Sequence, residues 1–307
     1  MSTNNTRIPA YLKAGDTIGI TCPAGSVQMK DMQYMIQQLE AWGFVVKLGT
    51  TVGTNFNKFS ATDDERRQDL QNMLDDDSIQ AILFGRGGYG AVRIIDGIDF
   101  STFIASPKWL LGYSDITCFH LHINRQLHIS TIHAHMNGGY LSSSHDLFST
   151  QSIYDTLTGK PIDYSIPSHS NNRVGECTAE LIGGNLALIS DLIGTPSEID
   201  TDGKILFIED IGEYKYNIDR MMWQLVRAGK LSNLKGLIVG GFTNTNDDEI
   251  PFGMTEVEII QEKVKDFTYP VCYDFPVGHQ AKNWALKLGV HYTFSVQANE
   301  LTLIEKV

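Results

Sequence analysis

The first half of the chain alternates short β-rich runs with amphipathic helical runs, and this alternation limits the fold more than any other feature. Residues 16–25 and 44–50 are rich in strand-forming residues, and apolar side chains recur at helical spacing over 29–43. This order predicts parallel strand pairing, because parallel neighbours need a long crossover between them. The pattern continues with an expected helix over 63–76, a strand over 79–85, a helix over 91–98 and a strand over 109–111.

Three loops follow strands of this predicted sheet, at residues 23–26, 86–90 and 112–115. We expect them to lie at one edge, because the carboxyl ends of parallel strands carry the binding and catalytic groups of such sheets. In the third loop Ser114 separates a buried strand from a helix, where its hydroxyl can act as a nucleophile or simply cap the helix. Asp115 and Ile116 follow the serine, so the G-x-S-x-G signature is absent.

The second half of the chain is also mixed α/β. Between the halves, residues 149–173 are polar and show little periodicity, which predicts an interdomain connection. We place the boundary near residue 165, with an N-terminal α/β domain over 1–165 and a C-terminal mixed α/β domain over 166–307. The second domain is expected to contain a strand and a helix over 175–195, a strand over 204–210, a helix over 218–229 and a strand over 234–243.

Composition restricts the partners and the compartment. The 307 residues carry a net charge of −12, which argues against nucleic acid or an anionic membrane surface as the main partner. Residues 1–20 lack the continuous apolar core of a signal peptide, so a cytoplasmic protein is expected. Four scattered cysteines without a C-x-x-C pair fit reduced thiols: Cys22, Cys118, Cys177 and Cys272.

Residues 85–90, GRGGYG, match G-x-G-x-x-G and follow a predicted strand, so a dinucleotide site is one interpretation. A Rossmann fingerprint belongs on the first βα turn, whereas this loop follows the third strand. The glycines also suit a close backbone approach to a substrate or an N–H directed at an oxyanion. Arg86 within the loop can clamp a substrate carboxylate, and its alternative role is a surface ion pair.

A serine nucleophile needs a base and an acid that orients the base. His279 lies on a loop after a strand-like run and the turn 276–278, a place where a base can be displayed. Glu209 follows the apolar run 205–208, and an ionisable group there needs a partner such as a histidine. Asp210 and Glu213 are the rival acids.

The other histidines offer a different chemistry. His133 and His135 alternate, which places both on one face of a strand and could hold zinc together with a third ligand. No carboxylate or cysteine spacing matches such a site. His120 and His122 fall inside the helix expected after Ser114.

Five ordered motifs resemble the LD-carboxypeptidases, a family that includes the microcin C self-immunity peptidases. The resemblance runs from residues 15–25 to about Gly289, nearly the whole chain. The motifs are GRGGYG at 85–90, GYSD at 112–115, GGNL at 183–186, IEDIGEYKYNIDRM at 208–221, and GH with Asn283 at 278–283.

The resemblance implies a flavodoxin-like or Rossmann-like N-terminal domain, a mixed α/β C-terminal domain, and an active site in the cleft between them. It makes Ser114 the nucleophile, Glu209 the acid that orients the base, and His279 the base. It also implies a serine carboxypeptidase that needs no cofactor or metal. The expected substrate is a small muropeptide, murein tetrapeptide, which loses its terminal D-Ala in peptidoglycan recycling. A homodimer is the expected assembly.

The loop around the nucleophile completes the predicted site. The backbone N–H of Asp115 and one from Gly87 or Gly88 would form the oxyanion hole, with Gly88 our choice. Arg86, Gly87 and Tyr89 are the expected substrate-binding residues, with Arg86 on the product-side carboxylate.

Two departures from the family pattern leave the substrate open: Ala134 and His135 replace an expected Gly-Pro, and Lys287 replaces a proline that often follows the GH motif. The microcin branch cleaves peptidyl-nucleotide conjugates and would need an aromatic or basic surface, for which Trp284 and Tyr214 are candidates. A noncatalytic muropeptide-binding module is the third class of function, although a complete set of triad candidates disfavours it.

Overall fold

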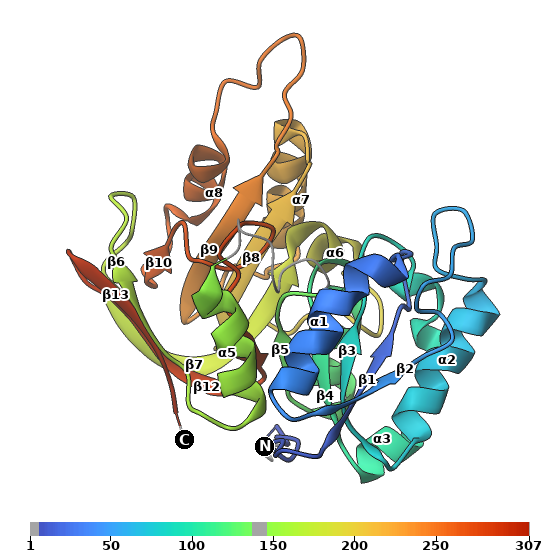
Figure 1. Ribbon diagram of the computed structural model, residues 1–307. Helices are drawn as coiled ribbons and strands as arrows, with labels where there is room; N and C mark the ends of the chain where they lie inside the picture. The colour runs from blue at the N-terminus through green and yellow to red at the C-terminus, as the bar shows by residue number, and fades with distance from the viewer. Residues whose placement is uncertain (1–5, 137–145, 307) are drawn as a thin grey trace.

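The computed structural model describes residues 6–136 and 146–306 and contains two β-sheets, one in each half of the chain (Figure 1). The first sheet has, within the described residues, six strands in the order β11-β5-β4-β3-β1-β2. They are parallel except β11, which runs antiparallel to β5. Their bounds are β1 Thr17–Thr21, β2 Val45–Leu48, β3 Ile79–Phe84, β4 Trp109–Gly112, β5 Thr131–His133 and β11 Leu286–Leu288.

This strand order is the flavodoxin-like order 2-1-3-4-5 with one added strand, so the predicted parallel sheet is confirmed. Helices cover both faces of the sheet, and its inner strands β1, β3 and β4 are accordingly buried on both sides. Buried side chains of α1 and α5 pack on one face, and those of α2, α3 and α4 pack on the other. The bounds are α1 Met29–Ala41, α2 Asp63–Asp75, α3 Ser101–Ala105, α4 Thr117–His122 and α5 Leu147–Leu157.

The second sheet is mixed and has, in the part of the chain that is described, seven strands in the order β10-β9-β8-β7-β12-β13-β6. The strands from β10 to β7 are parallel, and those from β7 to β6 pair antiparallel. The elements are β6 Asp163–Pro167, β7 Gly175–Asn185, α6 Leu186–Asp191, β8 Ile205–Ile211, α7 Lys215–Arg227, β9 Gly236–Thr243, α8 Glu256–Val264, β10 Val271–Cys272, β12 His291–Val296 and β13 Glu300–Glu305.

A hydrophobic cluster connects the two halves of the fold. A single cluster of buried residues joins α2 and α4 of the first half to α6, α7 and α8 of the second. Gly184 at the end of β7 approaches α4 so closely that a Cβ there would lie 2.5 Å from Thr117 Cγ2. Strand β11 returns from the second half to complete the first sheet. The relative position of the halves is therefore fixed by packing and by chain crossing.

Residues 149–173 form regular structure although their sequence shows little periodicity. Helix α5 and strand β6 occupy most of this segment. The buried face of α5 carries small polar residues, and their hydroxyls bond helix carbonyls, Ser152 to Ser149 at 2.7 Å and Thr156 to Ser152 at 2.6 Å. Because these side chains satisfy their own hydrogen bonds, the helix is buried without a hydrophobic period.

The predicted helix over 91–98 is wrong. Two short 3₁₀ turns, η1 Ala91–Arg93 and η2 Ile95–Gly97, occupy this stretch. The Ala91 N–H donates to Asp115 Oδ2 at 2.8 Å, which fixes the start of η1 against the turn that carries Ser114. Ile94, between the two turns, has φ −119°, which departs from helical geometry and divides the stretch.

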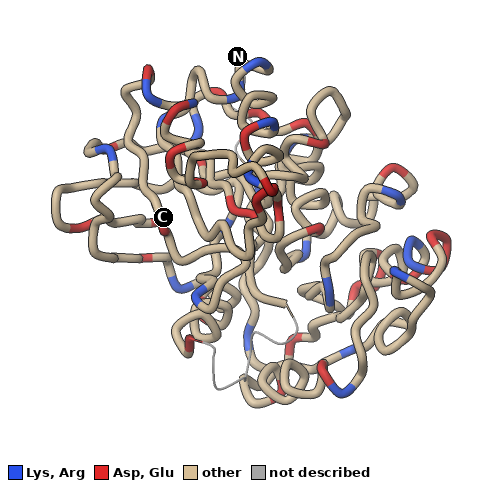
Figure 2. The backbone as a smooth tube through the Cα atoms, turned by 90° about the horizontal axis from the view of Figure 1, so that it is seen from above, with Lys and Arg blue, Asp and Glu red and all other residues tan. Residues whose placement is uncertain are grey.

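Charged residues are spread over both halves of the fold. Figure 2 shows Lys and Arg interspersed with Asp and Glu across both halves. Among the residues that the structure describes, no helix combines the length and the apolar character that a bilayer crossing demands.

Candidate active site

The three loops expected at one edge of the first sheet do meet there. They follow β1, β3 and β4, which are neighbours in the sheet. The Gly25 N–H donates to the Gly87 carbonyl at 2.8 Å. A Cβ on Gly87 would lie 2.9 Å from Ser114 Cβ and 3.1 Å from its Oγ. Glycine at 87 therefore allows the second loop to touch the serine.

Ser114 occupies a strained turn. It follows β4 and opens a 3₁₀ turn, η3 Ser114–Ile116, that leads into α4. Its φ is 63°, a left-handed conformation that costs a non-glycine residue about 1 kcal/mol or more. The side chain is half-buried, and in the described part of the chain its hydroxyl makes no hydrogen bond. The interpretation of Ser114 as a helix cap is thus unsupported, because η3 has no side-chain cap.

A buried carboxylate and a histidine from the second half lie beside Tyr113, the residue that precedes Ser114. His279 Nδ1 lies 2.7 Å from Glu209 Oε2, and the His279 backbone N–H donates to the same oxygen at 3.1 Å. Glu209 lies near the end of strand β8 and is fully buried. The imidazole is 12 % exposed at its side chain. One carboxylate oxygen thus fixes both the ring and the backbone of His279.

Two glycines make room for Glu209. A Cβ on Gly278 would lie 2.6 Å from Glu209 Oε2, and one on Gly240 would lie 3.3 Å from Glu209 Cβ. Gly278 has φ +103°, which favours glycine independently of space. The glycine beside His279 in the GH motif is thereby explained by a positive φ and by close approach to the carboxylate.

Glu209 also sets the protonation of His279. Burial alone lowers the pKa of the imidazole, but the hydrogen bond to Glu209 and the negative charges of Glu209 and Asp210 outweigh it. The net effect raises the His279 pKa above its usual value. A base with such a pKa accepts a proton more readily than an ordinary histidine.

The rival acids serve other parts of the fold. Asp210 points to the opposite side of β8, where it accepts hydrogen bonds from Asn185 Nδ2 at 2.8 Å and from the Ala187 N–H at 2.9 Å. Glu213 accepts from Asn217 Nδ2 at 3.1 Å near the start of α7. Strand alternation separates the first pair, because neighbouring side chains on a strand face opposite ways.

Tyr113 connects the two halves of the site. Its ring centroid lies 4.7 Å from that of His279, so the base packs beside the residue that precedes Ser114. The same ring meets His133 and His135 edge-on, at 5.9 and 5.8 Å. Burial and the charge of Glu209 raise the Tyr113 pKa to about 12, which keeps the phenol neutral. Sequence reasoning did not identify Tyr113, although its place next to the serine was a usable signal.

Asn283 holds the base loop from behind. Its Oδ1 accepts the Gly278 N–H at 2.8 Å and lies 3.2 Å from His133 Nε2. Burial, reinforced by the neighbouring histidines, lowers the pKa of His133 well below its usual value. Across 6–136 and 146–306, no group of three or more His, Cys, Asp or Glu side chains is arranged to hold a metal ion. The His133 and His135 pair thus contributes to packing around Tyr113.

The predicted oxyanion residues lie beside the serine. Asp115 follows Ser114 in η3, and its side chain is turned away to bond Ala91, so only its backbone N–H remains for the site. Gly88 has φ +96° and is exposed. The assignment of the Asp115 and Gly88 backbone N–H groups to an oxyanion hole stays a prediction.

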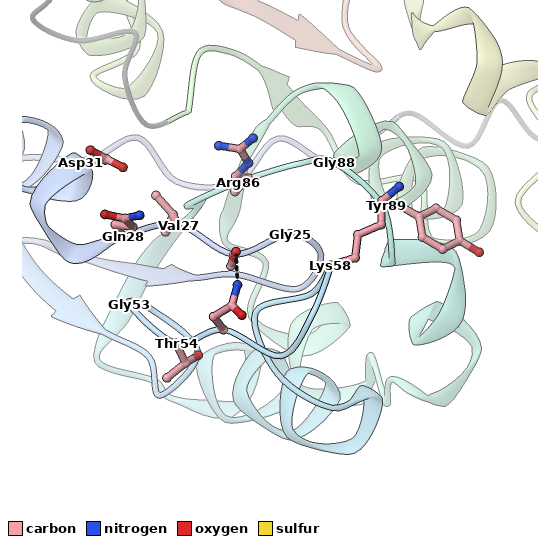
Figure 3. A pocket seen from close by; sticks show the side chains of 12 residues that line it. Gly25, Val27, Gln28, Asp31, Gly53, Thr54, Lys58, Arg86, Gly88 and Tyr89 are labelled. Atoms are coloured by element: carbon pink, nitrogen blue, oxygen red, sulfur yellow. Dashed lines mark hydrogen bonds between the residues drawn. The ribbon is translucent and has the colours of Figure 1, made fainter.

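Arg86 and Tyr89 border a pocket of about 490 Å³ (Figure 3). Arg86 is exposed and makes no ion pair with another described residue, so its alternative role as a surface ion pair is not observed. Tyr89 is 43 % exposed and packs on Phe59, with ring centroids 6.0 Å apart. The glycine loop leads into short 3₁₀ turns rather than an α-helix, which leaves no helix N-terminus for a pyrophosphate.

The two aromatic candidates for a nucleotide surface differ. Trp284 Nε1 donates to Asp146 at 3.0 Å, and the ring packs against Phe148, Tyr164 and Phe275. It is therefore a packing residue. Tyr214 is 40 % exposed at the start of α7, and its ring lies tilted against that of Tyr216, with centroids 5.5 Å apart.

These features define a class: a two-domain α/β protein with a serine on a strained strand-to-helix turn and a hydrogen-bonded glutamate–histidine pair that packs beside the preceding tyrosine. Comparison with known families narrows the class. Residues 18–134 match the LD-carboxypeptidase N-terminal domain, and residues 178–294 match the LD-carboxypeptidase C-terminal domain. The chain belongs to the LD-carboxypeptidase family. The predicted boundary near residue 165 lies between the matched segments and stays a prediction.

Relatives agree with this assignment. The chain is 34 % identical over 291 residues to the probable murein peptide carboxypeptidase of Bacillus subtilis, an alignment that covers 92 % of this chain and 89 % of the relative. A crystal structure of muramoyltetrapeptide carboxypeptidase from Oxalobacter formigenes has a TM-score of 0.86 at 25 % identity, over 95 % of this chain and 99 % of that one. The microcin C7 self-immunity protein MccF, in complex with aspartyl sulfamoyl adenosine, has the same fold, with a TM-score of 0.86 at 21 % identity over 97 % and 98 %.

Proposed function

We propose that the protein is a serine LD-carboxypeptidase that hydrolyses the amide bond between an L-configured centre and a terminal D-amino acid. The observation that carries this proposal is the buried Glu209–His279 pair beside the Ser114 turn. Murein tetrapeptide is the proposed substrate, with release of terminal D-Ala during peptidoglycan recycling. The names of the Bacillus subtilis and Oxalobacter formigenes relatives support this substrate.

In the proposed mechanism Ser114, Glu209 and His279 act as a triad. His279 Nε2 takes the proton of the Ser114 hydroxyl as Oγ attacks the carbonyl carbon. Glu209 keeps the proton of the imidazole on Nδ1 and stabilises the imidazolium that forms. His279 then protonates the leaving amine, and in the second half-reaction it activates the water that hydrolyses the acyl-enzyme.

The loop around the serine supplies the remaining groups. The backbone N–H groups of Asp115 and of Gly88 or Gly87 are the proposed donors to the oxyanion, each typically worth about 3 kcal/mol in the transition state. Arg86 is the proposed partner of the carboxylate on the leaving D-amino acid. An amidated tetrapeptide tests this role. The wild-type protein should cleave the free acid faster than the amidated peptide, and Arg86→Ala should cleave both at similar rates.

The decisive experiment incubates the purified protein and its Ser114→Ala variant with murein tetrapeptide in the presence of EDTA. Mass spectrometry follows the loss of D-Ala. We expect release by the wild-type protein alone, with the rate of the variant lower by a factor of at least 10³. Release that stops with EDTA, or that survives in Ser114→Ala, would refute the serine mechanism.

Intact tetrapeptide would instead direct attention to peptidyl-nucleotide conjugates, the substrates of the microcin branch. The shared fold with MccF and the exposed Tyr214 support this second candidate. A cytoplasmic homodimer remains our proposal for the state of the protein in the cell, and sedimentation at working concentration tests the dimer.

A further inference from the structure

Arg66 on helix α2 is a buried cation outside the proposed catalytic set. Its side chain is fully buried, with no exposed surface. Burial of a guanidinium is costly unless its N–H groups find acceptors, and an apolar side chain of similar size would avoid this cost. The acceptors of Arg66 therefore indicate what the residue does.

Most of these acceptors are backbone carbonyls at the edge of the first sheet. Nη1 of Arg66 donates to the Pro23 carbonyl in the loop after β1, and to the Gly90 carbonyl in the loop after β3 at 3.0 Å. Nε donates to the Ala61 carbonyl at 3.3 Å, and Nη2 pairs with Asp63. The guanidinium thus joins two neighbouring loops of the candidate active site.

The peptide unit between Gly90 and Ala91 is held at both ends by buried charged side chains. Its carbonyl accepts from Arg66, and its N–H donates to Asp115 Oδ2 at 2.8 Å. Asp115 is buried and directly follows Ser114. The guanidinium, one peptide unit and the carboxylate therefore form a continuous chain of contacts that ends beside the proposed nucleophile.

The glycines of this loop fit both contacts. Gly90 has φ +136°, and a Cβ there would lie 2.7 Å from Arg66 Nη1. Three positions earlier, a Cβ on Gly87 would lie 2.9 Å from Ser114 Cβ. A shift of the loop at Gly90 would therefore move backbone that packs directly on the serine.

A second contact between Arg66 and the loop runs through Phe59. The Arg66 guanidinium carbon lies 4.8 Å from the centroid of the Phe59 ring, a cation–π distance. The Phe59 ring in turn packs on Tyr89 of the loop, with centroids 6.0 Å apart. Arg66 therefore supports two consecutive loop residues, Tyr89 and Gly90.

We propose that Arg66 is a positioning residue for the proposed LD-carboxypeptidase reaction. It holds the loop 86–90 against Ser114, in the place from which the Gly87 or Gly88 N–H would stabilise the oxyanion. Arg66 itself contacts neither the substrate nor the reacting atoms, and the inference rests on the proposed function. Because a displaced oxyanion donor weakens transition-state stabilisation and not ground-state binding, loss of Arg66 should lower kcat and leave KM nearly unchanged.

Arg66→Met tests this role through three measurements. We expect kcat for murein tetrapeptide to fall about 10- to 100-fold, with KM within about threefold of wild type. The rate at which a fluorophosphonate labels Ser114 should fall by a similar factor, because the same N–H donors would stabilise its phosphoryl oxygen. The calorimetric Kd of the tetrapeptide on Ser114→Ala should stay unchanged when Arg66→Met is added.

Three further variants separate positioning from a general loss of structure. Arg67→Met changes the next residue of α2, which is 38 % exposed and pairs with Asp64 at 3.4 Å, and it should keep the wild-type kcat. Asp63→Asn removes the carboxylate partner of Arg66 but leaves both loop carbonyls in place, so it should lower Tm and keep kcat within about threefold. Arg66→Lys keeps the charge without the forked geometry, and its kcat should lie between those of wild type and Arg66→Met. It also decides the question if Arg66→Met does not fold.

The outcomes distinguish this proposal from the proposed function. Tetrapeptide cleavage with the same kcat in wild type, Arg66→Met and Arg66→Lys would overturn the positioning role and leave the function intact. An equal fall of kcat in Asp63→Asn would also overturn it, because that variant keeps the loop contacts. No cleavage, together with labelling of Ser114 that Arg66→Met slows, would support the positioning role and overturn the substrate. No cleavage and no labelling by the wild-type protein would overturn both.

Discussion

Two polar clusters join the halves of this protein, and they differ in how completely their hydrogen bonds are satisfied. In the first, Tyr113 and Ser114 meet His279 and Glu209. In the second, the Thr117 hydroxyl accepts the Asn185 N–H at 3.1 Å, and Asn185 in turn bonds Asp210. Both lie between the start of α4 and the ends of β7 and β8, but only the first has unused capacity.

The unused capacity is specific. Buried Glu209 Oε1 has no partner among the described residues, and the Ser114 hydroxyl is also unbonded there. In the second cluster both oxygens of Asp210 accept hydrogen bonds, and Asn185 Oδ1 caps α6 through the Leu188 N–H. A buried polar group without a hydrogen-bond partner costs about 1–3 kcal/mol of stability. The first cluster keeps such groups, which indicates a functional role. The second cluster has none on Asp210 or Asn185 Oδ1, which indicates a structural role.

Removal of one charge from the first cluster should produce the largest effect. Glu209→Gln keeps the shape of the side chain but removes the charge that orients and stabilises the imidazolium. We expect kcat/KM to fall by on the order of 10³ to 10⁴. His279 must be neutral to act as a base, and Glu209 raises its pKa. The acidic limb of the kcat/KM profile should therefore move to lower pH in the variant, which a pH-rate series measures.

Glu213→Gln is the matched control, because Glu213 lies four residues along the chain and bonds only Asn217 through its side chain. It should keep activity near that of the wild-type protein. An acidic limb that stays in place in Glu209→Gln would mean that another group titrates, and the comparison between the clusters would lose its basis.

A change at Gly278 should give the next largest effect. Gly278→Ala combines a positive φ with a Cβ only 2.6 Å from Glu209, so the base pair must shift. We expect kcat/KM to fall about 10- to 100-fold. Gly212→Ala has a similar positive φ, +75°, with open space around its Cβ, and it should cost only about 1 kcal/mol of stability. Kinetics and thermal unfolding of both variants separate the displacement of Glu209 and His279 from the strain of a positive φ. Equal losses of activity in the two variants would contradict the role of Gly278 in making room for Glu209.

The sequence pattern predicted the first sheet and its edge loops because each strand and crossover helix is local. Its periodicity does not depend on distant residues. It also favoured Glu209 over Asp210 only by resemblance, since both end the same strand. The direction of each side chain follows from the register of β8, which the sequence letters 208–211 do not display.

Non-local features escaped prediction. Strand β11 joins a sheet formed by residues more than 150 positions earlier, and Ser130 Oγ donates to the Leu288 carbonyl at 2.6 Å to hold it there. The buried face of helix α5 carries serines whose hydroxyls accept hydrogen bonds from distant backbone N–H groups. Ser149 accepts from Asn283 at 3.0 Å, and Ser152 accepts from Ala285 at 2.9 Å. Such pairs have no signature in a local window.

Loss of the second cluster should reduce stability more than turnover. Asn185→Ala removes the cap of α6 and one donor to the buried Asp210 carboxyl. We expect the free energy of unfolding to fall by about 2 kcal/mol. Urea denaturation measures this loss, and kcat/KM measured well below the transition should stay within about threefold. A large loss of turnover in fully folded protein would show that the second cluster also serves catalysis.

The smallest effect concerns the pH dependence of that cluster. Burial, and then the neighbouring Glu209 charge, raise the Asp210 pKa to about 7, whereas an unfolded aspartate titrates near 4. A raised folded pKa contributes stability that is complete below about pH 4 and is lost as pH rises through about 7. Asp210→Asn does not titrate, so its Tm relative to wild type should be higher at pH 9 than at pH 5 by about 2–4 °C. Asp248→Asn, which changes an exposed carboxyl, is the control. If the relative Tm of Asp210→Asn is the same at both pH values, the pKa of Asp210 is not raised in the folded protein. The hydrogen bonds from Asn185 and Ala187 would then compensate for burial of the Asp210 charge.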